Sequence, residues 1–498
     1  MFNEKIQHKD DRLKKMLTGP GSCSEVLKIA MPLILSTSAM TIQMFIDRVF
    51  LMWYGSEAMS GAMYGGLVSF TILSFFLGTV TYVNTFIAQY DGAGMPKRIG
   101  ASIWQGIYFA VAAGLLIAAF SFLAQTVMDL AGHDSVVRGH EVIYFKILCL
   151  GSMPYIMASA LSCFFTGRGK TWTVMWVSFI ATAFNLMFDY LLIFGKYGFP
   201  RWGVAGAALA TVSANVLSML IYFALLFSKR NRKNYAIANG WRFDIELFRR
   251  LMRFGLPSGI QFMLDVLGFS FFVTFIGRIG PVCLAASSIA VQINRLAFMP
   301  MFGFNTAICT LVGRYLGKNR ADLAQRSTWS AFALTSIYMS LLALCFILFP
   351  DFFLYPFASQ ADVGEYAIIR PIVINLLYFI AFYCLLDAGN LIFSGALKGA
   401  GDTRFVMKVS VSLNWLIMVI PSYFAIKFVK GTAGLYLAWA ALTIYVCVLA
   451  IVFLIRFLAG KWKTMRVIET AAPLIPQNIP AIPTVEAELP VFTSEEMD

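Results

Sequence analysis

Residues 25–53 read EVLKIAMPLILSTSAMTIQMFIDRVFLMW, an apolar stretch long enough to cross a lipid bilayer as a helix. A transmembrane helix needs about 20 such residues. The chain has about twelve runs of this kind, at roughly 25–53, 63–91, 99–131, 141–165, 171–195, 203–228, 250–277, 282–312, 327–350, 369–397, 405–426 and 432–459. None has the alternating pattern of a membrane β-barrel strand. We therefore predict an all-α membrane protein with twelve transmembrane helices, since a helix satisfies its own backbone hydrogen bonds in lipid.

The composition supports a membrane protein and excludes several other classes. The 498 residues are 59% hydrophobic and 13% charged, whereas a soluble domain is about 25% charged. A soluble enzyme, a disordered chain and a nucleic-acid binder are therefore excluded, and we expect no nucleic-acid partner. The eight Cys form no metal-binding pattern with the three His, and the chain has no GxxxxGK[ST] phosphate-binding motif. We expect no cofactor and no metal apart from Na⁺.

The basic residues predict the orientation of the chain. If the N-terminus lies inside, most Lys and Arg of the +13 chain fall in inside loops, as the positive-inside rule requires. An even number of spans then places both termini in the cytoplasm, in the inner (plasma) membrane. We expect a cytoplasmic arm (1–24), an N-lobe of six helices (25–228), a cytoplasmic linker (229–249), a C-lobe of six helices (250–460) and a disordered, proline-rich tail (461–498).

The two halves of the sequence repeat each other. Gly78 and Gly303 are 225 positions apart, as are Gly92 and Gly317, and Asn185 and Asn414 are 229 apart. The same spacing of 225 separates Pro32 from Pro257. Because each half holds an even number of helices, both enter the membrane from the same side. The halves should therefore form two six-helix bundles related by a pseudo-two-fold axis along the membrane normal.

Acidic residues inside the apolar runs are the candidate functional residues, because a carboxylate in the bilayer is costly and points to function. The first half has Asp47 and Asp189, with Asn185 one turn before Asp189, and the second half has Asp265 and Asp387. Close carboxylates retain a proton or bind a cation, and an oxygen cage suits Na⁺ or H⁺. The alternative is that each Asp pairs with a neighbouring cation. The candidate partners are Arg48, which follows Asp47, and Arg295 in the eighth run.

These segments resemble the multidrug and toxic compound extrusion (MATE) family, NorM-like, within the MOP flippase superfamily. In the first half the resemblance rests on Pro32, IDRVFLMWYG (46–55), FFTGRGKT (164–171), FNLMFDYLLIFG (184–195) and GVAGAALAT (203–211). In the second half it rests on FGLPSGIQFMLD (254–265), FYCLLDAGN (382–390) and FSGALKGAGDTR (393–404). The resemblance covers about residues 20–460. It implies a V-shaped pair of helix bundles that exports organic cations in exchange for Na⁺ or H⁺.

The resemblance also implies roles for single residues. Asp47, Asn185 and Asp189 match the N-lobe cation site of the family, and Thr211 looks like the hydroxyl that completes it. In the second half the matching C-lobe site consists of Asp265, Tyr383 and Asp387. Asp265 stands where NorM-like members carry Glu, so its side chain is shorter.

The expected activity is therefore secondary active multidrug efflux by alternating access, with Pro32 and Pro257 as helix bends because proline removes a helical hydrogen bond. The expected partners are the lipid bilayer and small organic cations, with the protein acting as a monomer. One alternative is a flippase for lipid-linked oligosaccharides of the same superfamily. Such flippases line the cavity with Arg and Lys, whereas Arg295 is the main basic exception in a mainly acidic predicted core. Another alternative is a channel or a membrane-embedded enzyme. An enzyme would need a metal cluster or a nucleophile–base pair, and neither is visible in the sequence.

Overall fold

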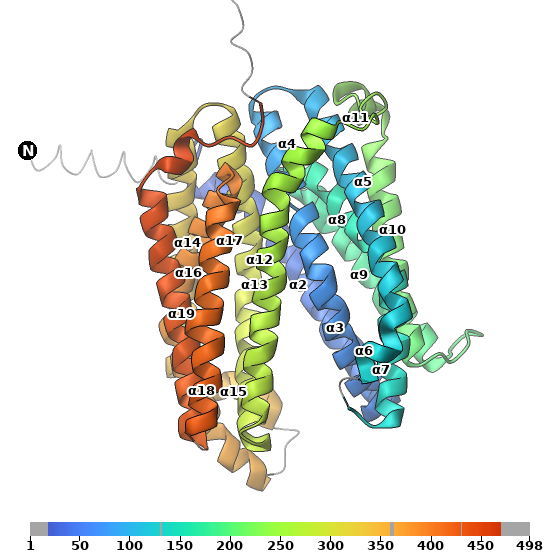
Figure 1. Ribbon diagram of the computed structural model, residues 1–498, viewed down its shortest axis with the longest axis vertical. Coiled ribbons are helices and arrows are strands. Elements are labelled where there is room, and N and C mark those ends of the chain that lie inside the picture. The colour runs from blue at the N-terminus through green and yellow to red at the C-terminus, as the bar shows by residue number, and fades with distance from the viewer. Residues whose placement is uncertain (1–17, 130–131, 359–362, 430, 470–498) are drawn as a thin grey trace, which may run out of the picture.

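The computed structural model describes residues 18–129, 132–358, 363–429 and 431–469. The regular structure of these residues is helical throughout, in two bundles (Figure 1). The N-lobe consists of α2 (Cys23–Tyr54), α3 (Ser56–Val80), α4 (Val83–Gly92), α5 (Pro96–Phe120), η1 (Ser121–Leu123), α6 (Ala124–Asp129), α7 (Ser135–Leu150), α8 (Ser152–Thr166), α9 (Thr171–Phe194) and α10 (Val204–Leu226). After α11 (Lys229–Asn234), the C-lobe consists of α12 (Ile245–Gly277), α13 (Pro281–Gly317), α14 (Ala321–Leu348), α15 (Pro350–Ala358), α16 (Val363–Ala400), α17 (Thr403–Leu413), the π-helix η2 (Asn414–Val419), α18 (Ile420–Phe428) and α19 (Thr432–Leu458).

Twelve spans are present in this part of the chain when each of two bent helix pairs is counted as one. Ten spans pass the length and hydropathy requirement directly. The bent pairs are Ser135–Leu150 with Ser152–Thr166, at 45°, and Pro281–Arg295 with Ala297–Gly317, at 42°. The predicted all-α, twelve-helix membrane fold is confirmed. One boundary differs, because α12 begins at Ile245, where the Asp244 side chain accepts a hydrogen bond from the backbone N–H of Leu247 at 3.0 Å.

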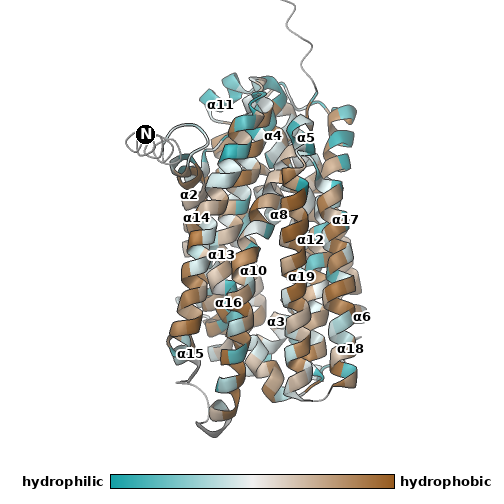
Figure 2. Cartoon of the chain, turned by 90° about the vertical axis from the view of Figure 1, so that its left-hand side faces the viewer, coloured by the Kyte–Doolittle hydropathy of each residue, from teal (hydrophilic) through white to brown (hydrophobic). Residues whose placement is uncertain are grey.

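Polar residues gather at one end of the molecule. Figure 2 shows hydrophilic colouring around α4, α5 and α11 and largely hydrophobic helices below them. This end, which we call the basic end, carries Arg98, Arg250 and Lys318 and both ends of the described chain. The outer faces of the helices below this end are largely apolar, as expected for helices in lipid, where each helix satisfies its own backbone hydrogen bonds.

The main contacts between the lobes are made by three helix pairs: α2 with α13, α3 with α12, and α4 with α13. These contacts follow the sequence repeat. Gly78 packs against Gly259 and Gly303 against Ile34, and each residue of one contact is 225 positions from its counterpart in the other. The two contacts are thus mates under a pseudo-two-fold rotation. Glycine permits them, because a Cβ on Gly78 would lie 2.8 Å from the Gly259 Cα.

Two further pairs obey the same symmetry near the axis. Asn84 Nδ2 donates to Thr310 Oγ1 at 3.0 Å, and Thr85 Oγ1 lies 3.3 Å from Cys309 Sγ. The predicted two-fold relation between the halves therefore appears as pairs of contacts, in which the residues of one contact are the repeat counterparts of the residues of the other.

The chain end corrects one expectation. Residues 461–469 were expected within a disordered tail, but the 3₁₀ turn η3 (Lys461–Thr464) forms and the segment packs on the basic end. The Val467 N–H donates to Gln89 Oε1 at 2.9 Å, and Glu469 contacts both lobes. These partners lie almost the whole chain length away in sequence, so the local composition of the segment gave no sign of them. The rest of the predicted tail (470–498) and most of the predicted arm (1–17) lie outside the described residues.

Candidate functional site

The N-lobe brings three of the four residues predicted for it together through side chains. Asp47 is on α2, and Asn185 and Asp189 lie one turn apart on α9, which packs against α2. With the Asn185 amide nitrogen facing the carboxylates, it lies 3.2 Å from Asp47 Oδ1 and 3.1 Å from Asp189 Oδ2. One amide thus bridges two carboxylates from different helices. In the same orientation the Asn185 oxygen accepts a hydrogen bond from the backbone N–H of Thr211 at 3.2 Å.

This cluster has an oxygen atom without a donor. Asp189 is fully buried, and its Oδ1 has no hydrogen-bond partner among the described residues. A buried polar atom of this kind normally has a partner, in the protein or in a bound species. A proton on the carboxyl group, or a cation beside it, would satisfy the atom. The Thr211 contact involves the main chain, so the hydroxyl role predicted for this residue stays a prediction.

Sequence reasoning missed two polar neighbours of the N-lobe cluster. Gln43 lies one turn before Asp47 on the same face of α2, and Thr182 Oγ1 donates to Gln43 Oε1 at 3.3 Å. The i, i+4 spacing of Gln43 and Asp47 was the available signal. These residues extend the row of oxygen atoms along the α2–α9 contact.

The C-lobe holds a second carboxylate with a bridging amide. Asp265 on α12 accepts hydrogen bonds from Gln261 Nε2 at 3.3 Å and from Asn414 Nδ2 at 3.4 Å. Gln261 Nε2 also donates to Ser410 Oγ at 3.0 Å. The oxygen atoms Gln261 Oε1 and Asn414 Oδ1 are buried and have no partner among the described residues. This lobe therefore also presents acceptor oxygens in excess of donors.

Asn414 was missed as a site residue, although the repeat pointed to it. It is the sequence counterpart of Asn185 and occupies the same chemical role, an amide that donates to a carboxylate on the first long helix of its lobe. Asn414 starts the π-helix η2. A π-turn inside a membrane helix often marks a functional position.

The other predicted C-lobe residues lie in a separate hydrogen-bond set. Asp387 on α16 is 4% exposed and accepts a hydrogen bond from Asn390 Nδ2 at 2.9 Å. Tyr383 is buried one turn earlier on the same helix. The structure shows no hydrogen bond that joins Asp387 or Tyr383 to Asp265 within the part of the chain it describes. The C-lobe carboxylates are thus not bridged as those of the N-lobe are.

The remaining predicted residues are placed as follows. Arg295, a candidate charge partner for an Asp, is exposed on α13 and forms no ion pair with a described acidic residue. Pro32 and Pro257 are buried inside α2 and α12, which run on through them as single helices. The two bends of more than 40° in the described chain lie elsewhere, at Gly151 and between Arg295 and Ala297. The helix-bending role of both prolines stays a prediction.

The lobes are closed against each other at the basic end. Gln89 Nε2 donates to the backbone oxygen of Gly399 at 3.0 Å, and the Tyr82 hydroxyl donates to that of Lys398 at 2.9 Å. A Cβ on Gly92 would lie only 2.0 Å from the backbone oxygen of Arg314. Backbones of the two lobes therefore touch here.

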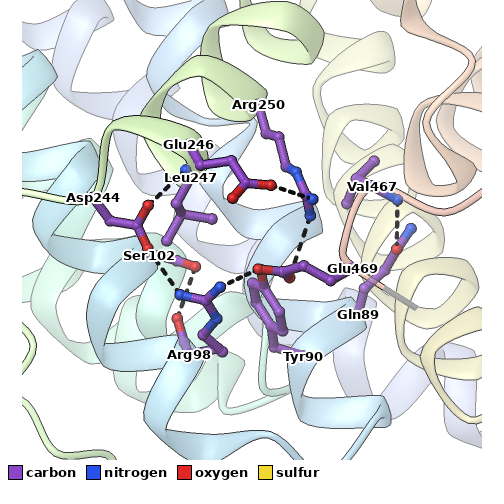
Figure 3. A network of polar contacts seen from close by, with 10 residues as sticks. All are labelled: Gln89, Tyr90, Arg98, Ser102, Asp244, Glu246, Leu247, Arg250, Val467 and Glu469. Atoms are coloured by element: carbon purple, nitrogen blue, oxygen red, sulfur yellow. Dashed lines mark hydrogen bonds and ion pairs between the residues drawn. The ribbon is translucent and has the colours of Figure 1, made fainter. Parts of the chain in front are cut away.

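An ionic network covers this closure, and Figure 3 shows its members pointing toward one another. One oxygen of Glu469 accepts a hydrogen bond from the Tyr90 hydroxyl at 2.5 Å and lies 3.4 Å from Arg250 Nη1, and the other accepts from Arg98. Arg98 also pairs with Asp244 at 2.8 Å. Burial raises the pKa of Glu469, but Tyr90 and the two arginines lower it by more, so the pKa lies below the ordinary glutamate value. The C-terminal segment thus ties α4 and α5 of the N-lobe to α12 of the C-lobe.

Farther from the basic end, apolar side chains of α2 and α3 are exposed. Phe45 on α2 is 66% exposed and Met63 on α3 is 57% exposed. Both helices contact the other lobe nearer the basic end, where Ile34 meets Gly303 and Gly78 meets Gly259. The structure therefore combines two buried oxygen-rich clusters with two lobes that are packed together at the basic end.

Comparison with known proteins gives a consistent set of matches. A family model described as MatE matches residues 32–191 and 257–424, one segment in each lobe. "Probable multidrug resistance protein NorM" of Thermotoga maritima is 25% identical over 450 residues, which cover 89% of this chain and 94% of that protein. The Pseudomonas putida protein of the same name is 27% identical over 452 residues, covering 90% and 96%.

Solved structures share the fold. One described as "Outward-facing conformation of a multidrug resistance MATE family transporter of the MOP superfamily" has a TM-score of 0.80 at 19% identity, covering 90% of this chain and 98% of that one. Another, described as "Reverse polarity of binding pocket suggests different function of a MOP superfamily transporter from Pyrococcus furiosus", has a TM-score of 0.81 at 18% identity, covering 91% and 98%.

Proposed function

Because the chain belongs to the MatE family of membrane transporters and is a multidrug efflux transporter rather than an enzyme, we propose that it exports organic cations in exchange for Na⁺ or H⁺ by alternating access. The chain is a multi-pass membrane protein. In this proposal it acts as a monomer in the inner membrane, with the basic end in the cytoplasm, as the positive-inside rule favours.

The observation that carries the coupling proposal is the N-lobe cluster. Two carboxylates from different helices share one amide, and the buried Asp189 Oδ1 has no donor among the described residues. In a low-dielectric setting two adjacent carboxylates cannot both stay charged unless a cation binds between them. Without a cation, one of them retains a proton. The carboxylate groups are hard oxygen ligands, which suit Na⁺ and H⁺ rather than a soft transition metal.

The exchange then follows from competition for negative charge. An ion that enters from the end opposite the basic end neutralises Asp47 and Asp189. A bound organic cation loses its counter-charge and leaves by the same end. Return to the opposite-facing state requires that the closure at the basic end opens, including the network around Glu469. Rocking of two symmetric lobes about a central site is the usual form of alternating access in transporters with internal repeats.

Ethidium efflux from proteoliposomes tests this function. An imposed Na⁺ gradient and an imposed pH gradient are applied separately to the wild-type protein, and one of them should drive efflux. Asp189→Asn should abolish gradient-driven efflux, since it removes the charge for which ion and drug compete. The matched control is Asp129→Asn, which changes an exposed carboxylate that pairs with Arg138 in the same lobe.

Two outcomes would overturn the proposal. If Asp47→Asn and Asp387→Asn both left gradient-driven efflux intact, the carboxylates would not couple transport. If the wild type gave no efflux under either gradient, the alternative function, a flippase for lipid-linked oligosaccharides, would become the better account.

A further inference from the structure

A pocket rich in arginine lies between α12 and α17 at the basic end, where the two helices pack side by side (Figure 1). Its volume of about 710 Å³ is within the range of small-molecule binding sites. Four of the lining residues are arginines: Arg249, Arg250 and Arg253 of α12 and Arg404 of α17. Glu246 is the one acidic residue among the described lining side chains. The pocket therefore has an excess of positive charge.

One of the four arginines is already used inside the protein. Arg250 Nη2 lies 2.7 Å from Glu246 Oε1, and Arg250 Nη1 lies 3.4 Å from Glu469 Oε2. The acidic lining residue and the carboxylate of the chain end are thus paired with the same guanidinium. The positive charge that remains in the pocket comes from the other three arginines.

These three arginines are free to bind an anion. Arg249, Arg253 and Arg404 are exposed, and none forms a hydrogen bond or an ion pair with any residue in the described part of the chain. Asp402, two positions before Arg404, pairs instead with Arg456 at 2.8 Å. Like charges around one pocket repel each other, and an anion between them relieves the repulsion. Because a guanidinium donates two parallel hydrogen bonds to phosphate oxygens, the pocket suits a phosphate group.

The position of the pocket along α12 places it at the membrane surface. From Phe254 to Gly277 the helix has a single charged side chain, Asp265, and a run of this length spans the hydrocarbon core of a bilayer. Arg253 directly precedes the run, so the pocket lies at the level of the lipid headgroups. Both α12 and α17 begin at the basic end. Their side chains lean toward the helix N-terminus, which directs the guanidinium groups to the headgroup layer.

Apolar side chains at the same pocket favour an anion that carries acyl chains. Met252 and Leu256 line the pocket beside the arginines. Leu256 lies on the hydrocarbon side of Arg253, one turn into the apolar run. Trp241 and Ile245 are exposed where α12 begins, as apolar and aromatic side chains are at a membrane–water interface. A soluble phosphate gains nothing from such side chains, whereas a phospholipid contacts them with its chains.

We propose that the pocket between α12 and α17 is a binding site for an anionic phospholipid of the leaflet at the basic end. The lipid phosphate binds the guanidinium groups of Arg249, Arg253 and Arg404, and an acyl chain lies against Leu256. Basic pockets between transmembrane helices bind the headgroups of such lipids in other membrane proteins. The site shares no residue with the carboxylate clusters of the two lobes, so the proposal does not depend on the efflux function.

Native mass spectrometry of the purified full-length protein in detergent tests the proposal. Phosphatidylglycerol and phosphatidylcholine with the same acyl chains are titrated separately, and the Kd of the first bound lipid is measured. The wild type should bind phosphatidylglycerol more tightly, because its headgroup has a net negative charge and that of phosphatidylcholine does not. Arg253→Gln and Arg404→Gln should each raise the Kd for phosphatidylglycerol about three- to tenfold, since a hydrogen bond to a charged group is lost. Neither should change the Kd for phosphatidylcholine.

The matched control is Arg320→Gln, which removes an exposed arginine of the same end that is already paired with Asp322 at 2.8 Å. It should change the Kd of neither lipid. Unchanged thermal unfolding shows that each variant is folded. If the pocket variants leave phosphatidylglycerol binding intact, or if Arg320→Gln weakens it equally, the lipid contacts the basic end only through its overall charge and the proposed site is refuted.

A soluble phosphate compound is the other source of the same chemistry, and a competition arm distinguishes it. Glycerol 3-phosphate, which has a phosphate but no acyl chains, is added together with phosphatidylglycerol. Weak competition supports the lipid site, because the apolar side chains then contribute to binding. If glycerol 3-phosphate displaces the lipid at comparable concentration from the wild type, the pocket binds a soluble anion and the lipid assignment is wrong.

Discussion

Replacing Glu469 by glutamine tests whether the C-terminal segment holds the two lobes together at the basic end. One carboxylate oxygen of Glu469 lies 2.5 Å from the Tyr90 hydroxyl and 3.4 Å from Arg250 Nη1, and the other accepts a hydrogen bond from Arg98. Glutamine keeps the size of the side chain and one acceptor oxygen. The substitution therefore removes the negative charge from a contact between lobes and little else.

The magnitude follows from the two arginine contacts. A hydrogen bond to a charged group contributes about 1.5–3 kcal/mol, against about 1 kcal/mol for a neutral pair. The side chains of Arg98 and Arg250 are 39% and 28% exposed, so solvent screening reduces the charge contribution of each to under about 1 kcal/mol. The closed state should lose about 1–2 kcal/mol in total, which raises the ratio of open to closed protein about five- to thirtyfold.

A native thiol reports this opening. Cys309 lies between the lobes with its Sγ 3.3 Å from Thr85 Oγ1. In a protein whose other seven cysteines are replaced by alanine, a membrane-impermeant maleimide added only on the side of the basic end labels Cys309 while that end is open. Glu469→Gln should speed labelling about five- to thirtyfold, following the open population.

The control uses a second carboxylate on the same arginine. Glu246 pairs with Arg250 at 2.7 Å, but its side chain is 70% exposed, and Glu246→Gln should change labelling less than about twofold. If Glu469→Gln labels no faster than the wild type, or if Glu246→Gln has an equal effect, the C-terminal segment does not hold the lobes closed.

Three further predictions use the same protein. Gly92→Ala, whose Cβ would lie 2.0 Å from a backbone oxygen of α13, should speed labelling of Cys309 several-fold. The control Gly139→Ala, whose Cβ would have nothing within 4 Å, should leave the rate unchanged. Equal rates in the two variants would contradict the close packing at Gly92. The pKa of Glu469 lies below the ordinary value, so its contribution to closure is present at neutral pH and is lost only as the pH falls through that lowered pKa. The ratio of the labelling rate of Glu469→Gln to that of the wild type should therefore be constant between about pH 7 and 5, which is above the usual glutamate range. A ratio that falls toward one by pH 6 would contradict a lowered pKa of Glu469. Gly268→Ala, whose Cβ would lie 2.1 Å from Asn414 Oδ1, should displace that amide and weaken efflux severalfold; unchanged efflux in a stable variant would show that the C-lobe amide is dispensable.

The sequence was sufficient for the architecture, for physical reasons. Runs of about 20 apolar residues have one stable form in lipid, so span number and helix type follow from length and composition. The spacing of 225 between Gly78 and Gly303 predicted a two-fold relation, and the contacts of these two glycines with Gly259 and Ile34 obey it. Glycine was informative here because the helices approach closely enough to exclude a Cβ.

The polar clusters could be predicted only in part. Carboxylates in apolar runs stand out, and the structure brings Asp47, Asn185 and Asp189 together. Gln43 and Gln261 did not stand out, because a single amide in a membrane helix has no charge to mark it and gains its meaning from partners on other helices. The cation-coupling role of Asp47, Asn185 and Asp189 stays a prediction.

The bends and the chain end depend on tertiary contacts that no local pattern encodes. The helix-bending role of Pro32 and Pro257 stays a prediction, and one bend of more than 40° falls at Gly151, where a Cβ would lie 2.2 Å from Val212. Glu469 forms its contacts with residues of α4, α5 and α12. Such pairs form only when the lobes have come together, so the composition of the final segment alone predicted disorder.

The most direct test of ion–drug competition is equilibrium binding of ethidium to the purified transporter at increasing Na⁺ concentration and, separately, at decreasing pH. The account predicts that the ethidium Kd rises as one of these ions saturates the N-lobe carboxylates and that Asp189→Asn removes this dependence. An ethidium Kd that is independent of both ions, or that keeps the same ion dependence in Asp189→Asn, would contradict the claim that ion and drug compete for the charge of Asp47 and Asp189.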